Sequence, residues 1–538
     1  MFINQNGYVG FIHPDGVFDD PRGESFRTIL YKKLTMHYSF INQMKLFDIG
    51  NTRTYSLNVY TNKKHNGFDC ISNLFVPSTI DGCYDKTIDE NTPVPGIKEN
   101  GVWATNGHPK RVVRIDKNIL KIFSAAIGGS DAYEGIPLPL IHSKEIYQVL
   151  ERFAQYSQTI ASCNDSVYIT QMWNETAAQN DNILMRNTHF GESENDVIYS
   201  GAHIGVANPV YKTSQRVCET HRAFDYISIE YISDEYLQRT NYSICCSLQE
   251  YNSQVPKTFW ESKYDSEYRL VSRKMIDPAG ERTLMSAIIV PGTGHTNGLL
   301  GIAFKDVRDL LKCAGAFASI PFDFFIKMLG KSNFYDDTVG MLPLLIDDSY
   351  TDDILVRVIG LNGVNRYYDG LIKRLGISIG VEWSKLDKRL ERRIINSERG
   401  WNRSIPFRSE FERRQALIEI DVLVAMSLKM SLEQLKTIYK IQFPVSQQYE
   451  EDTWYDENGR IVFTNNRSLT GVGFSRPEWE NSIKDAPAGA KFYRTIMDDT
   501  MPGGPVERTI EYVAPFVRCD REKDYEVAWK FFEEKYGN

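Results

Sequence analysis

"GYVGFIHPDGVFDD", residues 7–20, opens with an apolar run broken only by glycine, and this run predicts a buried β-strand. His13-Pro14-Asp15-Gly16 follows and predicts a sharp turn at the carboxyl end of that strand. In open α/β sheets, ligands approach the protein at such strand ends. A strand of this kind normally follows other strands of the same sheet. We therefore predict an α/β domain in which this strand is an inner member.

The composition is that of an ordinary soluble globular protein. The chain has 538 residues, enough for about three domains, and 42% of them are hydrophobic. No apolar run reaches the roughly 18–20 residues that a membrane helix needs, and no secretory signal is visible. The eight cysteines form no CxxC motif and show no metal-ligand spacing, which is typical of reduced thiols. These features predict a cytoplasmic protein without membrane contact.

The pattern of the chain changes twice and predicts three regions. Residues 1–123 are α/β, residues 124–345 contain many short strands, and residues 346–538 are mainly helical. In the first region we expect a helix over 23–44 and a long loop over 77–109. Strands are expected at 55–61, 111–115, 166–170, 226–233 and 282–290. The adjacent acidic residues Asp498 and Asp499 are interpreted as solvent-exposed residues of a loop, whose charges serve only solvation.

Two segments of the C-terminal region predict helices. "LDKRLERRII" carries Leu386, Leu390 and Ile394 at a spacing of four, an amphipathic pattern. "MSLEQLKTIYK" begins with a cap in which Ser431 and Gln434 bond reciprocally.

The segment 373–414 is basic although the net charge of the chain is −8. It holds twelve cations against six acids. Two interpretations stay open. One is a solvated helix face with ion pairs along it, and the other is a surface that follows the backbone of DNA or RNA.

Most motifs that mark a reaction type are absent from the sequence. There is no P-loop, no GxGxxG after a strand, no HExxH motif, no paired Cys/His cluster and no GxSxG. "PGTGHTNG" (291–298) has glycines but no phosphate-binding lysine. No metal site is predicted.

Several segments, in order along the chain, resemble large N6-adenine DNA methyltransferases of the bifunctional restriction–modification and DISARM phage-defence type. "GYVGFIHPDGVFDDPRGESFRTILYKKL" and "FINQMKLFDIGNTRTYSLNVYT" are similar to the part that follows the catalytic motif in that family. The segments 205–218, 234–242, 266–275 and 319–344 resemble its target-recognition domain. The segments 413–445 and 510–532 resemble its helical C-terminal region.

The resemblance implies a partial S-adenosylmethionine-dependent methyltransferase sheet over 1–123, a mixed α+β DNA target-recognition domain over 124–345, and a mainly helical domain over 346–538. The family's cofactor motif and catalytic Asn/Asp-Pro-Pro-Tyr/Phe loop have no counterpart before residue 1. We therefore expect the methyltransferase to need a second chain that carries both motifs and binds most of the S-adenosylmethionine. Other subunits of a defence system are further expected partners.

One segment resembles the missing catalytic loop. Asn208-Pro209-Val210-Tyr211 is similar to Asn-Pro-Pro-Tyr, in which the Asn binds the adenine amino group and the aromatic ring stacks on the flipped base. No Gly-rich cofactor motif follows it, so a DNA-facing or structural turn is the favoured interpretation and catalysis by Asn208 and Tyr211 is the alternative.

The remaining site predictions follow from position and residue type. His13, Pro14 and Asp15 are expected either to wall the cofactor site or to form a structural turn. Double-stranded DNA is the expected partner of nine side chains: Lys212, Arg216, Arg239, Asn241, Tyr242, Arg273, Lys327, Arg389 and Arg393. Gly292, Gly294 and Gly298 either let the backbone approach DNA or form a flexible loop. An alternative function is a catalytically inactive DNA-recognition module of a defence complex.

Overall fold

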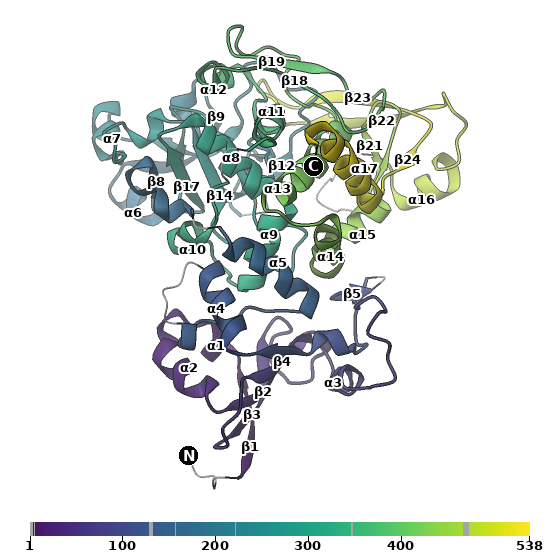
Figure 1. Ribbon diagram of the computed structural model, residues 1–538. Coiled ribbons are helices and arrows are strands. Elements are labelled where there is room, and N and C mark those ends of the chain that lie inside the picture. Colours follow the sequence, from purple (N-terminus) through teal and green to yellow (C-terminus); the bar gives the residue numbers. More distant parts are fainter. Residues whose placement is uncertain are drawn as a thin grey trace.

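The computed structural model describes residues 4, 6–99, 101–127, 133–156, 158–220, 222–345, 348–465 and 473–537. The fold is mixed α/β, with several small sheets and many helices. The N-terminal region forms the lower part of the molecule in Figure 1, and the middle and C-terminal regions together form the larger upper part. Within the described ranges, none of the helices combines the length and the apolar character that crossing a bilayer requires.

The N-terminal region is built on a five-stranded sheet in the order β1-β3-β2-β4-β7. Strand β3 lies antiparallel between β1 and β2, β2 runs parallel to β4, and β1 forms one edge. The elements of this region are β1 (Tyr8–Pro14), α1 (Gly16–Asp19), α2 (Glu24–Tyr31), β2 (Leu34–Ile41), β3 (Thr54–Thr61), β4 (Phe68–Leu74), α3 (Ser78–Cys83), β5 (Lys98–Glu99), β6 (Val102–Trp103), β7 (Val113–Ile115) and α4 (Lys117–Ala126).

Strands β1, β3 and β7 lie where strands are predicted in this region. The prediction that the first strand is buried and an inner member of the sheet is wrong, because β1 is an edge strand and most of its side chains are exposed. The predicted helix over 23–44 is wrong in its second half. The helix α2 ends at Tyr31, and Leu34–Ile41 forms β2. Strand β2 lies between β3 and β4, so strand pairing on both sides outweighs the local helical pattern. The predicted loop over 77–109 is interrupted by α3 and by the β5–β6 pair.

The middle region contains many short strands, arranged around the sheet β15-β14-β17-β8, and β8 and β15 lie in the strands predicted at 166–170 and 282–290. Its elements are α5 (Lys144–Ala154), β8 (Val167–Thr170), α6 (Glu175–Asn180), β9 (Leu184–Phe190), β10 (Ile198–Tyr199), β11 (Lys212–Ser214), β12 (Phe224–Tyr226), β13 (Arg239–Ile244), α7 (Leu248–Gln254), β14 (Arg269–Arg273), β15 (Ser286–Ile289), β16 (Gly294–His295), β17 (Leu299–Phe304), α8 (Val307–Ala318), α9 (Ile320–Leu329) and α10 (Asp336–Met341).

The strand predicted at 226–233 is wrong, because β12 ends at Tyr226 and the following residues form a loop. Gly294, in the glycine-rich stretch 291–298, also differs from its two predicted roles. Gly294 lies in β16, which pairs in parallel with β10, and a Cβ at this glycine would lie 2.9 Å from Tyr251 Oη. The glycine is thus required by internal packing and is not a point of close approach to DNA.

The C-terminal region contains the remaining helices and also several strands. Its elements are α11 (Thr351–Asn362), α12 (Asp369–Leu375), β18 (Ser378–Val381), β19 (Arg393–Asn396), α13 (Glu410–Ser427), α14 (Leu432–Gln442), α15 (Pro444–Asp452), β20 (Trp454–Tyr455), β21 (Ile461–Phe463), α16 (Arg476–Glu478), β22 (Lys491–Asp498), β23 (Val506–Val513), β24 (Val517–Arg518) and α17 (Arg521–Tyr536). The reciprocal cap of Ser431 and Gln434 is present at the start of α14, which confirms that prediction.

The amphipathic helix predicted from "LDKRLERRII" is wrong. Leu386 is fully exposed, and the segment ends as β19, which pairs with β18. Asp387 accepts hydrogen bonds from the backbone amide and the guanidinium of Arg389, which stabilises a local turn in place of a helix.

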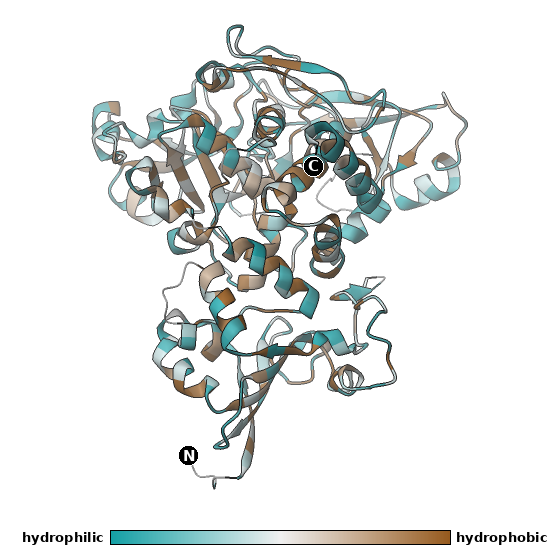
Figure 2. Ribbon diagram, in the orientation of Figure 1, coloured by the Kyte–Doolittle hydropathy of each residue, from teal (hydrophilic) through white to brown (hydrophobic). Residues whose placement is uncertain are grey.

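Helices α8, α9, α11 and α13 form the centre of the upper part, where apolar segments gather in Figure 2. Helix α13 is buried along almost its whole length, and α9 is buried from Ile320 to Met328. A helix that is buried on all sides needs no single apolar stripe. One continuous hydrophobic cluster runs from Phe18 to Phe532 and so includes residues of all three predicted regions.

Replacing Gly360 with alanine is expected to destabilise the protein by about 1–3 kcal/mol. A Cβ at this position of α11 would lie 2.3–2.8 Å from ring atoms of the buried Phe407. The unfolding midpoint in urea checks this. Gly10→Ala is the matched control, since its Cβ meets nothing closer than 3.9 Å. Equal midpoints for the two variants would contradict the prediction.

Candidate functional site

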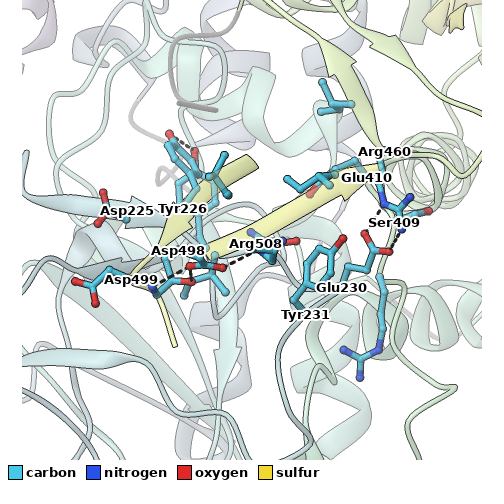
Figure 3. A pocket seen from close by; sticks show the side chains of 18 of the residues that line it. Asp225, Tyr226, Glu230, Tyr231, Ser409, Glu410, Arg460, Asp498, Asp499 and Arg508 are labelled. Carbon is cyan, nitrogen blue, oxygen red and sulfur yellow. Dashed lines mark hydrogen bonds and ion pairs between the residues drawn. The ribbon is translucent and has the colours of Figure 1, made fainter. Parts of the chain in front are cut away.

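A cavity lies where the middle region meets the C-terminal region (Figure 3). Strand β12 and the loop after it form one wall, and the start of α13 and the hairpin β22–β23 form the others. Its volume is about 280 Å³, and a second cavity of about 260 Å³ adjoins it. The residues that line both cavities are Asn208, Tyr211, Tyr226, Glu410 and Ile461.

The turn at Asn208–Tyr211 therefore lies between the two cavities. Asn208 Oδ1 accepts a hydrogen bond from the backbone amide of Val210 (3.1 Å). Tyr211 Oη donates to Tyr226 Oη (3.2 Å), and burial raises the pKa of Tyr211, so this phenol stays protonated. These contacts support the interpretation of a structural turn at a cavity, while catalysis by Asn208 and Tyr211 stays a prediction.

Ion pairs hold the walls of the larger cavity together. Arg460 on the C-terminal side binds both carboxylate oxygens of Glu230. Arg508 Nε lies 3.0 Å from Asp498 Oδ2, and its guanidinium lies 4.0 Å from the ring centroid of Tyr231. Figure 3 shows both pairs at the cavity. The Arg508–Tyr231 contact joins the hairpin β22–β23 to the middle region, and the Arg460–Glu230 pair joins the residue before β21 to it. The Arg508–Asp498 pair links the two strands of the hairpin.

Two of the predicted DNA-binding arginines converge on Asp499, at the edge of this cavity. Arg216 binds the carboxylate in bidentate fashion at 2.9–3.1 Å, and Arg239 Nη2 approaches Oδ1 at 3.4 Å. The hydrogen bonds from Arg216 hold the pKa of Asp499 below its usual value, although partial burial opposes them. The doubled acid Asp498-Asp499 is thus a pair of cation partners, and its interpretation as loop solvation is wrong.

The other residues of the middle region that are predicted to contact DNA are less exposed than Arg216. Asn241 and Tyr242 are buried in β13. Arg273 donates a hydrogen bond from Nε to the carbonyl of Ile204, and burial lowers the pKa of its guanidinium. Lys327 is only 4% exposed and donates to two backbone carbonyls, so its predicted contact with DNA is wrong. Lys212 is half-buried, with Nζ 4.2 Å from the ring centroid of Tyr226.

Most cations of the basic segment 373–414 bind partners inside the protein. Arg389 pairs with Asp387, and Arg393 is buried and pairs with Glu412. Ten of the twelve have such partners: Lys373, Arg374, Lys385, Lys388, Arg389, Arg393, Arg403, Arg408, Arg413 and Arg414. The interpretation as one solvated helix face is wrong, because the segment spans α12, β18, β19 and the start of α13. The interpretation as a surface that follows the backbone of DNA or RNA stays a prediction.

At the carboxyl end of β1, the three predicted wall residues have different environments. His13 is half-buried, and its Nε2 lies 3.0 Å from both Tyr60 Oη and Asn58 Nδ2. Asp15 is buried and accepts a hydrogen bond from Ser39 (2.5 Å). Pro14 is exposed beside an apolar groove of about 490 Å³.

The composition of this groove limits what it can hold. Its lining residues are Phe11, His13, Pro14, Gly16, Val17, Phe26, Leu30 and Tyr60. They offer apolar and aromatic surface and no charged partner for the amino acid end of S-adenosylmethionine. The groove therefore does not hold that cofactor alone, and the predicted role of His13, Pro14 and Asp15 as a wall of the cofactor site stays a prediction.

Sequence reasoning did not single out Glu281 and Glu410, two acidic residues that line these cavities. No local motif marks either residue, because the opposite walls of the cavities come from distant parts of the chain. Among the residues that the structure describes, no group of three or more His, Cys, Asp or Glu side chains is placed to hold one metal ion.

Comparisons with known proteins include a distant likeness among the solved structures. No protein-family model matches the chain, and no curated protein matches it. Among solved structures, the chain is similar to the type IIG restriction endonuclease BpuSI, with a TM-score of 0.28 and 9% identity. The likeness covers 83% of this chain, which spans about half (48%) of that protein. No conclusion about function follows from a likeness this distant.

Proposed function

We propose that this chain is the target-recognition part of an adenine-N6 DNA methyltransferase and completes the catalytic sheet of a second chain that binds S-adenosylmethionine. The observation that carries the proposal is the order of the N-terminal elements. The resemblance implies a partial methyltransferase sheet over 1–123. There β1, α2, β2 and β3 follow in that order along the chain, and the three strands belong to one sheet.

The edge of this sheet supports a partner chain. Strand β1 is the last strand at its edge of the described sheet, with Tyr8, Phe11 and Ile12 each more than half exposed. Phe26 and Ile29 of α2 are also more than half exposed. An open strand edge beside apolar side chains favours pairing with another polypeptide. In the proposed assembly the second chain adds strands at this edge, and His13, Pro14 and Asp15 border the cofactor.

In this proposal adenine leaves the duplex, and S-adenosylmethionine on the second chain would supply the methyl group to the amino nitrogen. The new C–N bond would form as the methyl–sulfur bond breaks, S-adenosylhomocysteine would leave, and the amino group would release one proton. The contribution of this chain is to position the DNA. Holding the adenine close to the methyl group lowers the barrier to transfer without a covalent intermediate on the protein. The proposed partners of this chain are double-stranded DNA, the second chain and other subunits of a defence system.

Radiolabelled methyl transfer to mixed-sequence DNA tests the proposal. The purified chain is assayed alone and with the product of the reading frame immediately upstream. Transfer only in the presence of both proteins is the expected result. Transfer by the chain alone would move catalysis to Asn208 and Tyr211 and overturn the two-chain arrangement. DNA binding without transfer in either assay would favour an inactive recognition module.

Arg216→Ala is expected to weaken DNA binding and to reduce the slope of log Kd against log salt by about 0.9. The side chain is 54% exposed, and it is the accessible member of the cluster with Arg239 and Asp499. Asp499→Asn is expected to change binding in the opposite direction, because it removes the carboxylate that neutralises both arginines. Fluorescence anisotropy at four salt concentrations measures both slopes, and an unchanged slope in both variants would contradict the prediction.

A further inference from the structure

The side chain of Arg408 carries hydrogen-bond donors that have no acceptor in the described part of the chain. Arg408 lies just before α13 and lines both the cavity of Figure 3 and a further cavity of about 650 Å³. The cations that line this further cavity, the arginine cavity, are Lys388, Arg389, Arg393, Arg403 and Arg408. Arg408 Nη1 donates to the carbonyl of Ile229 (2.9 Å), whereas Nε and Nη2 are buried and have no partner among the described residues. Buried N–H groups are almost always bonded in proteins, so these two atoms mark a place that suits an acceptor from outside the chain.

Nε and Nη2 together form the edge of a guanidinium that binds an oxyanion with two parallel hydrogen bonds. Two other arginines of this chain use the same edge in this way. Arg216 binds Asp499 through Nε and Nη2, and Arg460 binds Glu230 through the same two atoms. The edge of Arg408 therefore has the geometry of an oxyanion site.

The acidic side chains around Arg408 already have cation partners. All the carboxylates that line the arginine cavity take part in ion pairs: Glu230, Glu391, Glu412 and Glu457. Asp234, another acid near Arg408, binds Arg403. Within the described ranges, no carboxylate lies close enough to Arg408 to form an ion pair with it. The counter-charge of this guanidinium is thus left to a ligand.

The neighbours of Arg408 favour a ligand with several oxygens. Among the described residues, Nε of the buried Arg393 also has no partner. The side chain of Arg403 is half exposed. Burial and, next, the charge of Arg403 lower the pKa of Arg408 to about 10. An anion that contacts these guanidinium groups together opposes both effects.

We propose that the arginine cavity binds a terminal phosphate group, held by the Nε–Nη2 edge of Arg408 and by Arg393 and Arg403. A terminal phosphate offers three acceptor oxygens and nearly two negative charges, and so it suits several cations at once. Because the donors of Arg408 are buried, the ligand reaches them when the half-exposed side chain of Arg403 moves aside. The phosphate belongs to a small phosphate compound or to the 5′ end of a DNA strand. The inference does not depend on methyl transfer.

Calorimetry on the full chain tests the class of ligand, with inorganic phosphate and acetate at one ionic strength. Phosphate is expected to bind at one site, at least about tenfold more tightly than acetate. The absence of saturable phosphate binding, or equal affinities for the two anions, would overturn the inference.

Competition with a mixed-sequence duplex distinguishes the sources of the phosphate. If a duplex with 5′-phosphate ends displaces inorganic phosphate and the same duplex with 5′-hydroxyl ends does not, the ligand is a DNA end. If neither duplex competes, the ligand is a small phosphate compound. Displacement by the duplex with 5′-hydroxyl ends would show that backbone phosphates bind there, and the assignment to a terminal phosphate would be wrong.

Arg408→Gln removes the guanidinium and is expected to lower phosphate affinity at least about tenfold. Arg408→Lys keeps the charge without the paired donors and is expected to recover only part of that affinity. Arg399→Gln is the matched control, because this exposed cation of the same basic segment lies outside the lining of the arginine cavity.

Thermal unfolding in chloride checks that the variants fold, and phosphate is expected to raise the midpoint of the parent chain and not that of Arg408→Gln. If folded Arg408→Gln binds phosphate like the parent chain, the assignment is wrong. Phosphate binding without any binding of DNA would instead overturn the proposed function and leave this inference standing.

Discussion

Replacing Arg357 with alanine is expected to destabilise the protein by about 3–5 kcal/mol, the range for breaking a buried ion pair. Arg357 is fully buried in α11 and lies 2.7 Å from the carboxylates of both Asp353 and Glu419. Its Nη2 also donates to the carbonyl of Glu382. Burial would raise the pKa of Asp353, but Arg357 and neighbouring donors hold that pKa below its usual value. Without the guanidinium, Glu419 is left as a buried charge without a cation.

Thermal unfolding followed by circular dichroism and tryptophan fluorescence measures this loss, and coincidence of the two probes shows whether one transition is present. Arg308→Ala is the matched control. Its partner Asp352 lies 3.0 Å away, and both side chains are about one-third to one-half exposed, so the expected loss is below about 1 kcal/mol. If Arg357→Ala lowers the free energy of unfolding as little as the control does, the prediction that the buried ion pair stabilises the protein more than the exposed one is wrong.

The parts of the fold that could be predicted are those set by short-range patterns. The apolar run at the start of the chain does form β1, and Ser431 and Gln434 do cap α14. Segments whose structure depends on distant pairing were predicted wrongly. Residues 34–41 read as a continuation of a helix, yet β3 and β4 draw them into the sheet. The leucine spacing from Leu386 is outweighed by the pairing of β18 with β19.

The candidate site depends even more on contacts between residues that are distant in the sequence, so less of it could be predicted. A guanidinium that suits DNA phosphate suits an internal carboxylate equally well, so residue type alone does not distinguish the two roles. Arg216 is 283 positions from Asp499, and Arg460 is 230 positions from Glu230. No local pattern carries information over such separations. Arg393 and Lys327 look like surface cations in the sequence and prove to be buried, with partners in distant turns.

The stability of the protein is expected to fall as the pH is lowered from about 6.5 to about 4.5, by about 5 kcal/mol from two histidines alone. His295 and His203 are buried, and burial lowers the pKa of His295 to about 3 and that of His203 to about 4. In the unfolded chain both titrate near 6.5. Below that pH the unfolded state therefore binds more protons than the folded state, and acid favours unfolding.

The size of the effect follows from the proton difference. Each histidine contributes about 1.4 kcal/mol per pH unit while only the unfolded form is protonated. His295→Gln is thus expected to reduce the slope of unfolding free energy against pH by about that amount between pH 6 and 5. His189→Gln, at a partly exposed position of β9, is the control and is expected to leave the slope unchanged.

This pH window separates the histidines from the acidic groups. The pKa of Glu450 falls to about 2 because Arg414 and Arg521 outweigh the effect of burial. A lowered carboxyl pKa gives stability that is complete above about 4.5 and is lost as the pH falls toward 2. Loss of stability above pH 5 therefore reports on buried neutral histidines. If His295→Gln keeps the full parental slope there, His295 is protonated in the folded protein and its hydrogen bond with Tyr264 Oη (2.8 Å) tolerates the charge.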